Sequence, residues 1–252
     1  MEPFTEFVIT LLRLRLALGV CLLGDLFGTS PTRITQIFTT WITILSSSVT
    51  TALEWPSRRK VQKNMPRQFK KKYSKTRVII DCTEFFIQKP RMPSAQYKTY
   101  STYKSHNTCK ALIGITPSGL ISFVSKLWGG NVSDRHITKE SGLLELLEKD
   151  DLVMADRGFV IRDLCLQKDA DLLIPPFTRK CSWGKGKHLS VKEILATRDI
   201  ARLRIHVERA IERIKNFSIL SGTISNGLKP LLNQMVRVAA ALCNLYKPLV
   251  KK

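Results

Sequence analysis

Three carboxylate residues lie at the ends of, or within, apolar segments that are far apart in the chain. Asp81 and Asp156 each follow a short apolar run, at residues 78–80 and 152–155, and such runs are typical of buried strands. Glu208 lies in a stretch whose apolar residues have helical spacing. Carboxylates from separate elements are ligands that Mg²⁺ and Mn²⁺ prefer, and these ions also bind phosphate oxygens. The pattern indicates metal-dependent phosphodiester chemistry.

Each of these acids also has a purely structural interpretation. Asp156 is followed two residues later by a glycine, and an Asp-x-Gly sequence commonly forms a turn. Asp81 could cap a turn, although a strand end followed by Cys-Thr is a weak turn signal. Glu208 is four residues from both Arg204 and Glu212, so these three side chains could form a row of surface ion pairs. From the residues alone, that row is the favoured interpretation of Glu208.

Composition indicates a polyanionic partner. The chain of 252 residues carries 41 Lys and Arg against 20 Asp and Glu, a formal charge of +21. This charge exceeds what solubility requires and favours DNA as the partner. With 44% hydrophobic residues, the chain is long enough for a large domain and a small one.

Cysteine usage and hydropathy favour a nuclear protein without a membrane span. The six cysteines include no close pair that resembles a zinc or redox motif, which favours reduced thiols in the nucleus or cytosol. The apolar segment at residues 16–24 is shorter than the ~20 residues that a bilayer requires. We therefore expect no membrane span.

The amino-terminal residues 1–53 predict a small helical unit that resembles a helix-turn-helix. Helices are expected at residues 7–18 and 20–27, and a third begins at Pro31 with Ser30 as its N-cap. In this interpretation Arg33 and Gln36 face outward and contact DNA. An equally open alternative is that these helices only pack on the next domain or on a second copy of the chain, which would make a homo-oligomer.

The following residues, 54–76, are strongly basic and lack an apolar period. They include Lys70, Lys71 and Lys72, which we predict to contact DNA phosphates. The same composition fits a solvated linker or a nuclear-import signal, and a solvated linker is the simplest interpretation.

Residues 77–252 predict an α/β domain. Strands are expected at residues 77–86, 111–115, 121–128, 152–155 and 172–174, and helices at residues 139–148 and 161–168, before a long helix that contains Glu208. This order is close to that of a ribonuclease-H-like mixed sheet flanked by helices. Lys185 and Lys187 lie in a basic, Gly-containing loop, where DNA contact and simple solvation are equally plausible.

Three blocks of this domain resemble the DDE superfamily endonuclease domain of Harbinger-type transposases. The blocks are residues 80–84 (IDCTE), 154–159 (MADRGF) and 204–215 (RIHVERAIERIK), and the likeness covers about residues 77–246. The preceding helices are similar to the helix-turn-helix of the family. Glu212 replaces the glycine expected in the third block.

The resemblance implies that Asp81, Asp156 and Glu208 bind two divalent ions, Mg²⁺ or Mn²⁺, for DNA strand cleavage and strand transfer. It favours Glu208 over Glu212 as the third ligand, and it makes a separate DNA-binding partner protein a further alternative. The opposing hypothesis is a catalytically silent DNA-binding protein that retains the fold.

Overall fold

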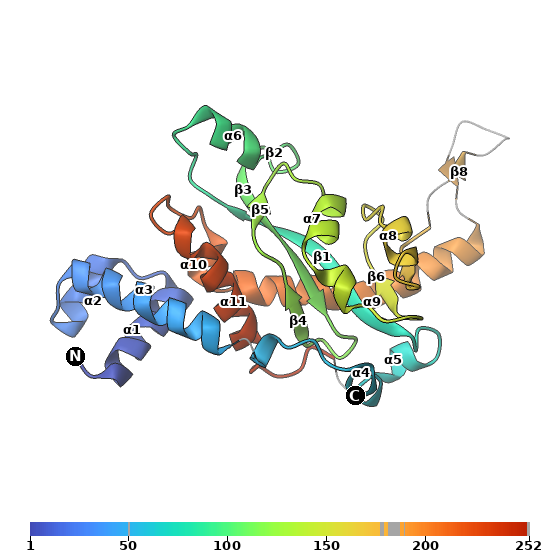
Figure 1. Ribbon diagram of the computed structural model, residues 1–252, viewed down its shortest axis with the longest axis horizontal. Helices are drawn as coiled ribbons and strands as arrows, with labels where there is room; N and C mark the ends of the chain where they lie inside the picture. The colour runs from blue at the N-terminus through green and yellow to red at the C-terminus, as the bar shows by residue number, and fades with distance from the viewer. Residues whose placement is uncertain (50, 177–178, 181–186, 189, 251–252) are drawn as a thin grey trace.

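A computed structural model describes residues 1–49, 51–176, 179–180, 187–188 and 190–250. These residues form a mixed α/β fold with a curled central sheet flanked by helices (Figure 1). The α/β prediction is confirmed. Among the described helices, none has both the length and the apolar character needed to cross a membrane.

The sheet has the strand order β2-β3-β1-β6-β7, with β4 and β5 also paired to β3. Its strands are β1 (Thr76–Phe86), β2 (Tyr100–Ser101), β3 (His106–Ile115), β4 (Ile121–Val124), β5 (Trp128–Gly129), β6 (Leu152–Met154) and β7 (Asp171–Leu173). β1 pairs antiparallel with β3, whereas β6 is parallel to β1 and β7 is parallel to β6. An antiparallel half followed by two parallel strands is the arrangement of a ribonuclease-H-like sheet. A separate short pair joins β8 (Arg179–Lys180) to β9 (Lys187–His188).

Helices cover both faces of the sheet, because side chains along β1 alternate between two apolar clusters. Val78 and Ile80 pack with α7 (Asp134–Glu140), the 3-10 helix η2 (Leu143–Leu146) and α8 (Arg162–Leu166). Ile79 and Phe85 pack on the other face with α9 (Val191–Lys215), α10 (Ser218–Ser221) and α11 (Leu232–Cys243). The remaining short elements are α6 (Pro93–Thr99), η1 (Thr51–Leu53) and η3 (Lys229–Leu231).

The amino-terminal helices α1 (Pro3–Leu16), α2 (Val20–Phe27) and α3 (Pro31–Ser48) lie at one end of the molecule, beside α10 and α11 (Figure 1). The Ser30 hydroxyl accepts a hydrogen bond from the Arg33 amide at 3.2 Å, which confirms the predicted N-cap. Phe38 and Ile42 of α3 enter the main apolar core. The helical unit therefore packs directly on the α/β domain.

The long helix α9 begins with a capping box formed by Ser190 and Glu193. Its apolar stripe, which includes Leu203, Val207 and Ile214, is buried against the sheet. Packing of this stripe fixes the rotation of the helix and therefore the direction in which Glu208 points.

Three expectations about secondary structure were wrong. The strand expected at residues 121–128 is divided into β4 and β5. The solvated linker instead contains α4 (Arg58–Lys63) and α5 (Arg67–Lys70), since Val61, Met65 and Phe69 are buried in the main core. The helix expected at residues 139–148 is divided into α7 and η2, because Gly142 has a φ of +82°, which does not continue a helix.

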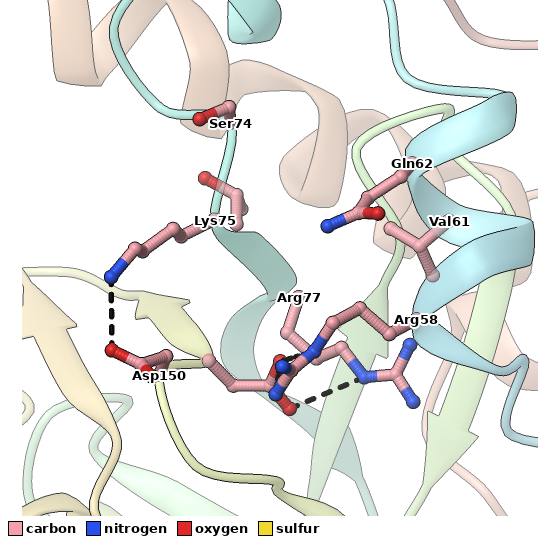
Figure 2. A pocket seen from close by; sticks show the side chains of 9 residues that line it. Arg58, Val61, Gln62, Ser74, Lys75, Arg77 and Asp150 are labelled. Carbon is pink, nitrogen blue, oxygen red and sulfur yellow. Dashed lines mark hydrogen bonds and ion pairs between the residues drawn. The ribbon is translucent and has the colours of Figure 1, made fainter.

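A buried ion pair attaches the α4 segment and β1 to the start of β6. The Arg77 Nε lies 3.3 Å from Asp151 Oδ2, and these two side chains are only 2% and 1% exposed. Arg58 Nη2 approaches Asp151 Oδ1 at 2.9 Å. These residues line a pocket, and Figure 2 shows Arg58 and Arg77 side by side in it, with Lys75 reaching Asp150 nearby.

Asp151→Asn is expected to lower the free energy of unfolding by about 3 kcal/mol, because it removes the buried counter-charge of Arg77 and leaves only the half-exposed Glu148 paired with it. Urea unfolding measures this loss. The matched control is Asp150→Asn, which removes an exposed carboxylate that pairs with Lys75 at the surface, and its effect should be much smaller. Equal losses of stability in the two variants would contradict the conclusion that the buried Asp151 ion pair stabilises the fold.

Candidate active site

Two of the three predicted acids lie at the same level of neighbouring parallel strands. Ile79 of β1 is paired with Met154 of β6, and Asp81 and Asp156 each follow two residues later. Side chains two residues apart point to the same face of a strand, and both Ile79 and Met154 belong to the cluster beneath α9. The pairing register therefore directs Asp81 toward α9, and Asp156 follows the end of the neighbouring β6.

Arg204 of α9 connects Asp156 to the third acid. Its Nη1 atom donates a hydrogen bond to Asp156 Oδ1 at 2.9 Å, and its Nη2 atom lies 3.7 Å from Glu208 Oε1. The Arg204 side chain is 10% exposed, whereas the Asp156 and Glu208 side chains are 52% and 57% exposed. The guanidinium is thus mostly covered, while both carboxylates remain accessible to solvent.

Asp81 is the most enclosed of the three acids, and its charge interacts with the others. The pKa of Asp81 is raised to about 6, mainly by burial, and the negative charges of Asp156 and Glu208 contribute to this rise. Arg204 and a hydrogen bond from the Cys82 amide, at 2.9 Å, act in the opposite direction. The three predicted acids therefore belong to one electrostatic site.

The donor chemistry of this site fits a divalent cation. Three carboxylates from β1, the end of β6 and α9 face one region, and the positive charge of Arg204 already lies between two of them. Within the described part of the chain, no group of three acidic, His or Cys side chains is close enough to hold an ion as it stands. Binding of an ion would require Arg204 and the acids to rearrange.

Glu84 faces the opposite side of the sheet from Asp81. Its carboxylate accepts a hydrogen bond from Thr108 Oγ1 at 2.7 Å and lies 3.7 Å from Lys110 Nζ. Lys110 also pairs with Asp134 at 3.2 Å. Glu84 and Asp134 are thus held by Lys110 in a separate polar cluster.

The predicted DNA-contacting residues occupy several parts of the surface. Arg33 is half exposed and pairs with Glu6 at 2.8 Å, and Gln36 is exposed on the same helix. Residues 70–72 are exposed at the end of α5, where Lys72 pairs with Asp199 of α9 at 2.6 Å. Lys185 lies outside the described residues, and of Lys187 only the backbone, in β9, is described. Contact of these residues with DNA stays a prediction.

Sequence reasoning gave Arg204 only the role of a surface ion-pair partner. Its spacing from Glu208 predicted the ion pair within α9, which the structure contains. Its hydrogen bond to Asp156, 48 residues earlier in the chain, had no local signal.

The strand order and the common location of the three acids place this chain in the ribonuclease-H-like class of folds. The chain belongs to the DDE superfamily endonuclease family, whose sequence profile matches residues 80–244. This family generally uses divalent metal ions and acts on DNA. No match was found among curated proteins or solved structures.

Proposed function

We propose that this protein is a nuclear, metal-dependent DNA endonuclease of the Harbinger transposase type. The observation that supports the proposal is the contact of Arg204 with both Asp156 and Glu208, beside the enclosed Asp81. Carboxylates that repel one another require a neighbouring cation. A site of clustered acids on a strongly basic protein fits phosphodiester cleavage of a polyanionic substrate.

Asp81, Asp156 and Glu208 are the proposed metal ligands. Two divalent ions bound by them would activate the attacking oxygen and neutralise the leaving oxygen at the phosphate. Asp156 and Glu208 are exposed enough to meet a phosphate group at the surface, whereas Asp81 anchors the site from within the sheet. Strand transfer would use a DNA 3′-hydroxyl in place of water.

Arg204 acts in this proposal as the resident cation of the metal-free protein. Its two Nη atoms hold Asp156 and Glu208 toward one another and reduce the repulsion between them. Because Arg204 and Glu208 are on the same helix, this arrangement also fixes α9 relative to the end of β6.

Nicking of supercoiled plasmid tests the proposal. Wild-type protein should nick the plasmid with Mg²⁺ or Mn²⁺ and not with EDTA, and Asp156→Ala should reduce the rate at least ~100-fold because a metal ligand is lost. Asp171→Ala is the matched control, since Asp171 is an exposed acid on the neighbouring β7 and should be dispensable.

The same contact of Arg204 also favours a second candidate, a DNA-binding protein without catalytic activity. In that case Arg204 permanently replaces the metal, and the acids serve only to hold α9 in place. This candidate predicts that wild type and Asp156→Ala both bind DNA and that neither shows metal-dependent nicking. That result would overturn the nuclease proposal.

A further inference from the structure

A basic groove lies on α9, away from the three acids. It has a volume of about 630 Å³ and is formed by one face of α9 and the segment that follows α5. Its lining includes Lys71, Lys72, Asp199, Arg202, His206 and Arg209. Residues 202, 206 and 209 are four and three apart, so they share one face of the helix. Arg204 and Glu208 point between a third and a half of a turn away from this face.

The groove carries an excess of positive charge that the protein itself does not neutralise. Lys72 pairs with Asp199 at 2.6 Å and thereby connects the two walls. In the described part of the chain, no carboxylate lies within ion-pair distance of Lys71, Arg202 or Arg209, and all three are exposed. The groove thus contains four basic side chains and one acidic side chain.

His206, which lines the groove, has a buried nitrogen that no described residue contacts by a hydrogen bond. His206 is 7% exposed, and its Nδ1 has no hydrogen-bond partner among the described residues. A buried polar group of this kind is costly unless a ligand or water satisfies it.

We propose that this groove binds the phosphate backbone of duplex DNA, independently of metal. Arg202 and Arg209 are separated by about 10 Å along the helix axis, so they can contact different phosphates of one strand. Lys71 meets the same strand from the opposite wall. The choice of DNA as the polyanion rests on the proposed function, whereas the site itself rests on charge and geometry.

The test is DNA binding in EDTA, measured by fluorescence anisotropy with a labelled 30-base-pair duplex over a series of salt concentrations. The variant is Arg202→Gln with Arg209→Gln. Its matched control is Lys126→Gln with Lys149→Gln, which removes the same charge from exposed lysines outside the groove. The groove variant should bind at least ~10-fold more weakly near 0.15 M salt, and the slope of log K against log salt should become shallower by about 2. The control should change affinity less than ~3-fold.

Equal weakening in both double variants would overturn the proposal, because the general charge of the protein would then explain the binding. Tighter binding of a duplex RNA that depends on the same two arginines would overturn the assignment to DNA. Because the measurement needs neither metal nor turnover, an inactive wild type with a selective loss in the groove variant would contradict the nuclease proposal and support this one.

Discussion

Glu208→Gln is expected to reduce metal-dependent plasmid nicking at least ~100-fold, whereas Glu212→Gln, one helical turn away, should change it less than ~3-fold. Both residues are exposed glutamates on α9, and both substitutions remove one charge without shortening the side chain. Glu208 pairs with Arg204, which also contacts Asp156, and its charge reaches Asp81. Comparison of the two variants therefore shows whether a loss of activity comes from removal of a site residue or from the change in charge of the helix.

Initial nicking rates at saturating Mn²⁺, with protein folding checked by circular dichroism, measure the difference. Glutamine keeps a carbonyl oxygen that can accept a hydrogen bond from Arg204, so the fold of the site should persist. Equal rates for Glu208→Gln and wild type would exclude Glu208 as a metal ligand. Loss of activity in Glu212→Gln alone would transfer that role to Glu212.

Asp81→Asn is expected to abolish metal-dependent nicking while it stabilises the metal-free protein at pH 7 by up to about 3 kcal/mol. The pKa of Asp81 is raised to about 6 from a usual value of 3.8, mainly by burial. The folded state therefore disfavours the charged carboxylate, and asparagine removes this charge. A residue that is kept for function at a cost in stability behaves in this way.

The sign of the pH dependence follows from proton binding. Between pH 4 and pH 6 the folded protein holds a proton on Asp81 that the unfolded chain has already released, so the wild type loses stability relative to Asp81→Asn as the pH rises. Urea unfolding at pH 4, 5, 6 and 7 in EDTA should show the difference growing across this range. If the difference in unfolding free energy between wild type and Asp81→Asn is constant with pH, the raised pKa of Asp81 is contradicted.

Addition of metal should stabilise the wild type, in contrast to the cost of Asp81 in the metal-free protein. Mg²⁺ or Mn²⁺ should raise the unfolding temperature of wild type and leave that of Asp81→Asn unchanged, because an ion stabilises only the state that binds it. Equal shifts in both proteins would place the ion elsewhere.

The strands that carry the aspartates could be predicted from sequence because each is an apolar run with an abrupt polar end. Asp81 and Asp156 lie at such ends, and parallel pairing of β1 with β6 brings them to one level. The sequence did not reveal this register, which depends on contacts between strands. For the same reason it did not reveal the reach of Arg204 to Asp156.

The basic segment before β1 shows a different limit of prediction from sequence. Val61, Met65 and Phe69 are four residues apart, which is a helical signal, but the surrounding lysines and arginines made the segment resemble a solvated linker. Burial of these three residues brings the segment against the domain, where Lys71 and Lys72 meet α9. Charge density alone did not distinguish a linker from the wall of a groove.

The equal level of Asp81 and Asp156 on adjacent parallel strands restricts how this gene can change. Successive side chains of a strand alternate between faces, so one residue inserted or deleted within β6 would turn Asp156 away from α9 and toward α7 and α8. Divergent copies of the gene can therefore exchange apolar residues along β1 and β6, but they must keep the number of residues in both strands.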